Sequence, residues 1–186
     1  MTIIELVKIT IETFVKEGKI ISPPDDLSEE FLKEKSGTFI TIKKNGKLRG
    51  CIGTYLPTQI NIAQEIIRNA VAAATKDYRF GPIQKEELPN LSYIVYILSY
   101  PEAVKDINTL NPKKFGIVVR TGPLAFPNEE SVVFNGLVPY RTGVLLPDLE
   151  GVDTIERQIS IACRKGGFDP TKEKILIYRF TVKKYQ

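Results

Sequence analysis

Residues 48–54 read LRGCIGT and follow the dipeptide Asn45-Gly46. Asn-Gly between two runs of strand-forming residues is a strong short-range signal for a β-hairpin. The run before the turn covers residues 38–44, and the run after it covers residues 47–54. The sequence therefore predicts a hairpin whose second strand carries one cysteine between two glycines.

Apolar periodicity divides the rest of the chain into helices and strands. Thr2 and Glu5 have the spacing of a capping box, and the helical stripe of apolar residues that follows ends at Gly18. We expect a short helix over residues 28–35, a longer one capped by Asn61 or Thr58 that reaches about residue 76, and one capped by Asp153 or Thr154 that reaches residue 164. Further strands are expected over residues 92–100, 115–120, within 137–146 and over 174–183. This mixture of helices and hairpin strands predicts an α+β fold.

The two halves of the chain share a pattern. Gly53-Thr54-Tyr55-Leu56-Pro57 has the form Gly-x-x-Leu-Pro, which recurs 90 residues later at 143–147, and a helix is expected after each copy. We interpret residues 37–82 and 115–170 as duplicated strand–strand–helix halves; chance agreement of common residues is the alternative. We expect both halves to share one mainly antiparallel sheet flanked by helices, in a single domain over residues 1–186, because no Ser- or Gly-rich linker separates them.

Composition excludes several kinds of chemistry. The 186 residues contain no histidine and two cysteines, so Cys-His and Ser-His-Asp catalysis and histidine-based zinc sites are ruled out. We expect neither a metal nor another cofactor.

The net charge of +4 does not argue for nucleic acid. The chain has no long apolar run and begins without the basic region of a signal peptide, so we expect a cytoplasmic protein that does not enter a membrane.

Strand alternation places the side chains of the second hairpin strand. Leu48, Gly50 and Ile52 are expected on the core face, with Arg49 and Cys51 together on the opposite face. A guanidinium near the sulfur would favour a reactive thiolate, and the flanking glycines would let another backbone or a ligand approach. The alternative is that the cysteine is a small buried side chain between two packed layers.

A charged cluster, Asp77-Tyr78-Arg79-Phe80, follows the helix expected over residues 61–76. Asp77 and Arg79 can form an ion pair at the helix end. Arg79 can instead bind an anion together with Arg49, if the hairpin and the helix end are neighbours. The corresponding place in the second half is Gly167-Phe168 and carries no charge, so we expect any site to lie on the first half.

Three segments resemble the AMMECR domain family: GTFITIKKNGKLRGCIGT at 37–54, NAVAAATKDYRFGPI at 69–83 and TGVLLPDLEGVDTIERQISIACRKGGF at 142–168. The resemblance covers nearly the whole chain, and it implies an intracellular α+β domain with two similar halves. Residues 121–141 depart from it, since a longer segment stands where the family pattern has a short turn. The resemblance implies a binding or adaptor protein, acting in prokaryotes with Memo-type proteins and radical-SAM enzymes.

Three hypotheses about function follow. The first is a non-catalytic binding or accessory protein that engages a small anionic ligand or a protein partner, possible partners being Memo-type or radical-SAM proteins. The second is an enzyme with Cys51 as nucleophile, and the third is a nucleic-acid-associated regulator. The candidate site residues, which match the family motifs, are Arg49, Gly50, Cys51, Gly53, Asp77 and Arg79.

Overall fold

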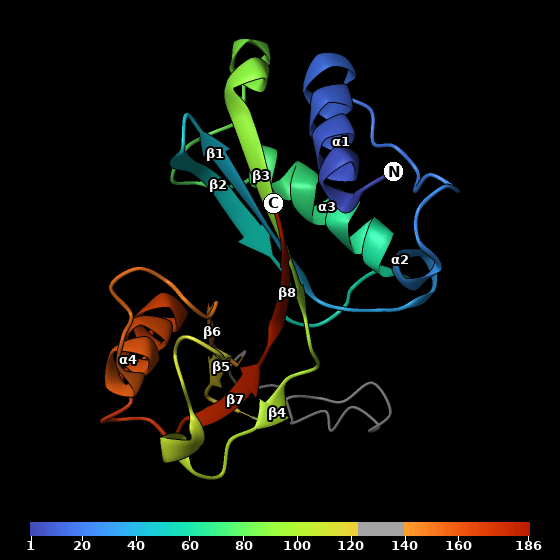
Figure 1. Ribbon diagram of the computed structural model, residues 1–186. Helices are drawn as coiled ribbons and strands as arrows, with labels where there is room; N and C mark the ends of the chain where they lie inside the picture. The colour runs from blue at the N-terminus through green and yellow to red at the C-terminus, as the bar shows by residue number, and fades with distance from the viewer. Residues whose placement is uncertain (123–139) are drawn as a thin grey trace. The chain divides into compact units, whose positions relative to one another are not determined.

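The computed structural model describes residues 1–122 and 140–186, and these form two compact units (Figure 1). The first unit contains residues 1–100 and 182–186, and the second contains residues 101–181. The candidate site residues all lie in the first unit. The expected insertion over residues 121–141 lies mostly outside the described residues.

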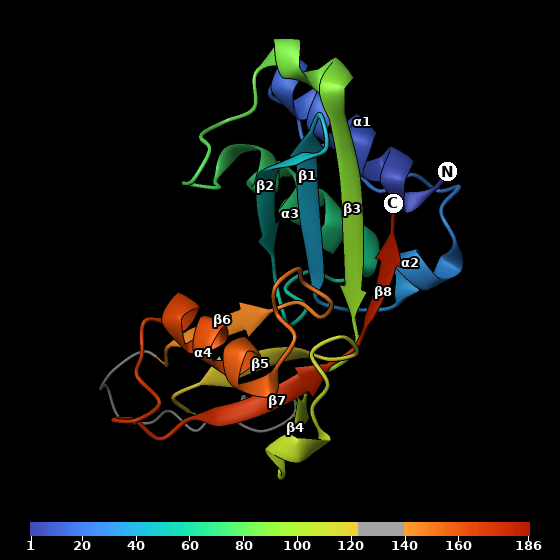
Figure 2. The same cartoon turned by 60° about the vertical axis from the view of Figure 1, so that its left-hand side comes forward.

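The first unit is a four-stranded antiparallel sheet with helices on one face (Figure 2). Its sheet order is β2-β1-β3-β8, where the strands are β1 (Thr38–Lys44), β2 (Lys47–Gly53), β3 (Leu91–Leu98) and β8 (Val182–Tyr185). Its helices are α1 (Ile3–Glu17), α2 (Glu29–Lys33) and α3 (Ile62–Thr75), with a 3-10 helix, η1 (Lys85–Asn90), before β3. The strand β2 therefore lies at one edge of the sheet.

The helix boundaries follow local capping chemistry. Thr2 and Glu5 make the expected capping box, and Gly18 ends α1 in the left-handed conformation with φ of 71°. Asn61 caps α3 by accepting a hydrogen bond from the backbone N–H of Gln64. These are the residues that the sequence pattern indicated, because an oxygen-bearing side chain satisfies free N–H groups at a helix start.

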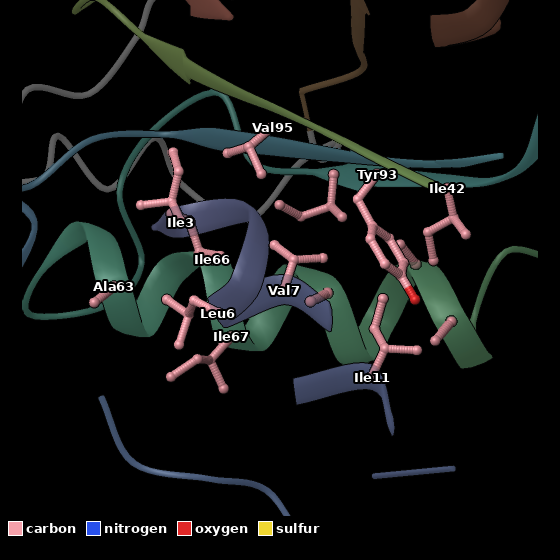
Figure 3. Close-up of a cluster of buried hydrophobic side chains, with 14 of the residues drawn as sticks. Ile3, Leu6, Val7, Ile11, Ile42, Ala63, Ile66, Ile67, Tyr93 and Val95 are labelled. Atoms are coloured by element: carbon pink, nitrogen blue, oxygen red, sulfur yellow. The ribbon is translucent and has the colours of Figure 1, made fainter. Parts of the chain in front are cut away.

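The core of the first unit lies between the sheet and the helices α1 and α3 (Figure 3). One apolar stripe of α1 and one of α3 face each other, and both contact the inner face of β1 and β3. Fully buried members of this cluster include Leu6, Val7, Ile11, Ile40, Ile42, Ile66, Ala70 and Val95. Helix stripes and strand alternation thus converge on one core.

The second unit has its own four-stranded antiparallel sheet, ordered β4-β7-β5-β6. The strands are β4 (Glu102–Ala103), β5 (Gly116–Arg120), β6 (Thr142–Leu145) and β7 (Leu176–Phe180), with a 3-10 helix, η2 (Ile107–Thr109). Helix α4 (Ile155–Gly166) packs on β5 and β6, and a separate apolar cluster includes Leu110, Ile117, Val119, Leu145, Val152, Ala162, Cys163 and Phe168. Burial raises the pKa of the Cys163 thiol.

The α+β class and the antiparallel pairing are confirmed, but the expectation of one shared sheet is wrong. The strand expected over residues 174–183 is divided at Thr181: β7 joins the sheet of the second unit and β8 joins the sheet of the first. The reason is that each hairpin and its helix bury a separate apolar cluster, so each sheet has its own inner face. The single domain and the internal duplication stay predictions.

The two hairpin–helix segments do share one packing detail. A Cβ added to Gly50 in β2 would lie 2.5 Å from the carbonyl oxygen of Ala73 in α3, and a Cβ on Gly143 in β6 would clash with the carbonyl oxygen of Ala162 in α4. Each strand therefore uses a glycine where the following helix packs against it. In an alignment of the two halves, this packing matches Gly50 with Gly143, whereas the sequence pattern matched Gly53 with Gly143.

Candidate binding site beside strand β2

A β-bulge in β2 changes the directions of its side chains. Ile42 pairs with Gly50 and Lys43 pairs with Leu48, so Arg49 is the extra residue on β2. Leu48 is consequently 43% exposed and does not join the core. The expected inward direction of Leu48 is wrong, because the bulge interrupts the two-residue period of the strand.

The glycines of β2 are explained by close packing. Gly50 admits the backbone of α3, as described above. A Cβ on Gly53 would clash with the Phe39 side chain and with the carbonyl oxygen of Thr38 on the neighbouring strand. The backbones that approach Gly50 and Gly53 therefore belong to α3 and β1 of the same chain.

Cys51 is half-buried, and its backbone and sulfur have different partners. The sulfur lies 3.3 Å from the hydroxyl oxygen of Thr41, which is its partner across the hairpin. The backbone N–H donates to Asp77 Oδ2 at 2.8 Å. The Asp77 carboxylate thus accepts a hydrogen bond from the Cys51 amide, and it is held there by the backbone and not by the thiol.

The Asp77–Arg79 pair ties the end of α3 to the edge of β2. Arg79 donates from Nε and Nη2 to the two carboxylate oxygens of Asp77 at 2.9 and 2.7 Å. This bidentate contact, together with the Cys51 N–H, holds the pKa of Asp77 well below its ordinary value, at about 2. The predicted helix-end ion pair is therefore present. The Asp77 side chain is 4% exposed, and it also accepts a hydrogen bond from the Cys51 N–H at the edge of the sheet.

Arg49 forms a second charged cluster with Glu87 of η1. Its Nε and Nη2 donate to the carboxylate of Glu87 at 2.9 and 2.8 Å, and its Nη1 and Nη2 donate to the carbonyl oxygens of Gly81 and Pro82. Lys44 donates to Glu87 as well. The Arg49 guanidinium is the main cause that lowers the pKa of Glu87 to about 2.

Arg49, Cys51, Asp77 and Arg79 are therefore brought together, because Cys51 contacts Asp77 and Arg49 reaches the loop that follows the Asp77–Arg79 corner. Gly53 lies instead against β1. Each guanidinium is neutralised by a carboxylate: Arg49 by Glu87 and Arg79 by Asp77. The condition for anion binding by Arg49 and Arg79 together, that the hairpin and the helix end are neighbours, is met, but an anion would compete with these two ion pairs. Whether these residues bind a ligand stays a prediction.

A buried carboxylate that the sequence analysis missed organises the neighbouring loop. Glu65 of α3 is fully buried and accepts hydrogen bonds from the Thr54 hydroxyl, from both the N–H and the hydroxyl of Thr58, and from the N–H of Gln59, at 2.6–2.8 Å. Asn69, one helical turn later, donates to the Thr38 carbonyl oxygen and to the Thr54 hydroxyl. The signal was present, since two polar residues four apart interrupt the apolar stripe of α3.

These contacts shape a groove of about 610 Å³ beside β2, within the first unit. The end of β2 and the outer side of α3 form two of its walls, and the segment after α1 forms the third. Its lining residues are Ile20, Ile21, Ser22, Pro23, Ile52, Gly53, Thr54, Gln59, Gln64, Ile67, Arg68, Asn69, Val71, Ala72 and Lys76. We call this the β2–α3 groove; it combines an apolar floor with polar walls, as ligand sites do.

The charge of the β2–α3 groove is positive. Arg68 and Lys76 line it, and none of the described residues that line it carries a carboxylate. Arg68 donates to the Thr58 hydroxyl, but neither cation forms an ion pair with any residue in 1–122 or 140–186. No sequence pattern indicates these two residues, because exposed cations are common and only the fold shows that the two share a groove.

The described part of the chain contains no group of three or more Cys, Asp or Glu side chains arranged to hold a metal ion. Within residues 1–122 and 140–186, no helix combines the length and apolar character that a membrane crossing requires.

Known proteins resemble this chain over nearly its full length. A Thermotoga maritima protein is 46% identical over 177 residues, with 95% of this chain and 92% of the relative covered. A Clostridium acetobutylicum protein is 36% identical over 184 residues, which cover 98% of this chain but 35% of the relative. A crystal structure of an uncharacterised protein from Pyrococcus horikoshii has a TM-score of 0.80 and 28% identity, covering 98% of this chain and 88% of that chain.

The similarity agrees with the fold described above, and the names of these relatives state no activity. A model of the AMMECR1 family matches residues 4–185. This chain belongs to the AMMECR1 family.

Proposed function

We propose that this protein is a non-catalytic binding or accessory protein and that the β2–α3 groove is its binding site. The single observation that carries the proposal is a groove lined by two cations, Arg68 and Lys76, with no carboxylate among the described residues that line it. Every other guanidinium at the LRGCIGT strand is neutralised within the protein. A groove of this charge and volume favours an anionic or acidic ligand.

The environment of Cys51 supports binding over thiol catalysis. A nucleophilic cysteine needs a neighbouring base or a positive charge that favours the thiolate. The sulfur lies beside the Thr41 hydroxyl. The Arg79 guanidinium, which interacts electrostatically with Cys51, is paired with the Asp77 carboxylate, and this carboxylate also accepts from the Cys51 amide. The proposal therefore gives Cys51 a structural role in the strand that borders the groove.

An accessory role also agrees with the Clostridium acetobutylicum relative. The match covers 35% of that relative, so the region like this chain is there part of a larger polypeptide. The proposal includes Memo-type and radical-SAM proteins as partners, because the family resemblance implies them. It also includes a cytoplasmic setting.

The proposal is tested by native mass spectrometry of the protein purified under mild conditions from its natural source. The wild-type protein is expected to carry an additional mass, and an R68Q/K76Q variant, which removes two groove charges, is expected to lose it. A matched K8Q/K47Q variant removes two exposed charges outside the groove and keeps the additional mass, as does Cys51→Ala. An additional mass lost only from Cys51→Ala would instead support a covalent thiol site.

A further inference from the structure

We propose that the occupant of the β2–α3 groove is an extended acidic peptide segment that adds to the edge of β2 as a fifth strand. The segment carries an apolar residue flanked by two acidic residues, with the pattern acidic-x-apolar-x-acidic. This inference rests on the proposed function and names the partner of that same site. It combines three observations: a free strand edge, an apolar helix wall and two cations at a matching separation.

The edge of β2 has backbone groups directed into the groove. In the described residues β2 pairs with β1 alone. The N–H of Thr54 donates inward to the Thr38 carbonyl oxygen, and the N–H of Cys51 donates outward to Asp77. Because backbone directions alternate along a strand, the N–H and C=O of Gly53 also point outward, and Gly53 lines the groove.

Of the outward-facing backbone groups at this edge, the Cys51 N–H already has a hydrogen-bond partner, and the N–H and C=O of Gly53 are available. Asp77 occupies the Cys51 N–H, which blocks strand pairing towards the start of β2. Within residues 52–54 the outward N–H and C=O belong to Gly53, so pairing is directed to this residue beside the groove. Main-chain hydrogen bonds at a strand edge supply affinity for an extended peptide without requiring a particular sequence.

The outer side of α3 supplies the specificity. Ile67 and Val71 form an apolar floor, and Arg68 within α3 lies eight positions before Lys76, the residue that caps the end of this helix. Eight residues of α-helix rise about 12 Å. Four residues of an extended strand advance about 13 Å, and side chains at i, i+2 and i+4 share one face.

A single strand can therefore place two carboxylates near the two cations and an apolar side chain on the floor between them. A strand added to β2 also runs along α3, because β2 and α3 are antiparallel neighbours: Cys51 contacts Asp77 after the end of α3, and Thr54 contacts Glu65 in its first turn. Charge complementarity, length and direction thus agree with one occupant. A small anion would use one cation and leave the strand edge unpaired.

The test uses fluorescence anisotropy with a fluorescein-labelled peptide, Ser-Gly-Glu-Thr-Ile-Thr-Glu-Gly-Ser, and the full chain. We expect saturable binding with a Kd of about 10–100 µM, in the range of small transient interfaces. The R68Q/K76Q variant is expected to bind about 10-fold more weakly, while K8Q/K47Q binds as the wild type does. Replacing both glutamates of the peptide by lysine abolishes binding.

Backbone methylation tests the strand addition itself. Two peptides are compared, one N-methylated at the Glu, Ile and Glu residues and the other at the two Thr residues. In a paired strand only one of these sets of N–H groups faces β2, so we expect one peptide to lose binding and the other to retain it. Equal binding by the two methylated peptides contradicts strand addition.

The two proposals fail in distinguishable ways. Absence of saturable peptide binding at about 1 mM, together with a co-purifying mass that R68Q/K76Q loses, overturns the peptide inference and leaves the groove as a small-anion site. Peptide binding that is equal in the wild type and R68Q/K76Q overturns the inference as well. If the co-purifying mass is also equal in the two proteins, the proposed function fails with it.

Discussion

At the scale of single residues, the charges around the LRGCIGT strand have two different roles. Asp77 and Glu87 hold Arg79 and Arg49 in bidentate contacts that fix the edge of β2 to the turn after α3. Arg68 and Lys76 have no such partners among the described residues and face the β2–α3 groove. The residue types alone do not separate these roles, because an arginine that holds a strand in place and one that binds a ligand look the same in a sequence.

The carboxylates Asp77 and Glu87 predict acid sensitivity. Their pKa values are lowered in the folded protein from ordinary values of 3.8 and 4.5 to about 2 each. The folded state is therefore favoured by their ionisation above pH of about 4.5, and this stabilisation is lost as the pH falls towards 2, because the unfolded chain takes up protons first. For Asp77 the effect is about 2 kcal/mol in the free energy of unfolding.

Urea unfolding measured from pH 7 to pH 2 checks this expectation. A D77N/E87Q variant should be less stable at pH 7 and should lose less stability on acidification than the wild type. A control with two exposed carboxylates replaced, D25N/E86Q, should follow the wild-type curve. Parallel curves for D77N/E87Q and the wild type would show that these contacts do not supply the pH-dependent stability.

At the scale of elements, the sequence predicted most helices and strands but not the details that make the site. The capping box at Thr2, the Asn45-Gly46 turn and the cap at Asn61 were all readable, because each depends on neighbouring residues. The bulge at Arg49 was not, since it depends on how β2 packs on α3. The division of the last strand at Thr181 was missed for the same reason: periodicity does not show which sheet a strand joins.

Close packing of β2 on α3 predicts a large effect of Gly50→Ala. The added Cβ would lie 2.5 Å from the Ala73 carbonyl oxygen, so β2 must move away from the helix. We expect a loss of about 3 kcal/mol in the free energy of unfolding. The Cys51 amide, which depends on the same approach for its bond to Asp77, should exchange its hydrogen faster.

Gly46→Ala is the matched control for Gly50→Ala. Gly46 has a φ of 79° with no atom within 4 Å of an added Cβ, so its cost is conformational and about 1 kcal/mol. Cys51 amide exchange should be unchanged in this variant. Equal destabilisation and equal exchange in the two variants would contradict the packing explanation.

At the scale of the whole molecule, membership of the AMMECR1 family and the α+β class followed from motifs spread along the chain. The position of the candidate site within the first unit was predicted only in part. The sequence pointed to the charged corner at 77–80, where the charges neutralise each other, whereas the groove needs residues from the segment after α1, from β2 and from α3. Such a combination of distant segments is defined by the packed fold.

The most direct test of the central claim measures occupancy of the β2–α3 groove at Lys76 itself. The protein is treated with a lysine-reactive reagent both in an extract of its natural source and after purification with its ligand removed, and labelling of each lysine is quantified by mass spectrometry. We expect labelling of Lys76 to be several-fold lower in the extract, while exposed Lys8 and Lys47 react equally in both samples. Equal labelling of Lys76 in the two samples would contradict the claim that this groove is the binding site.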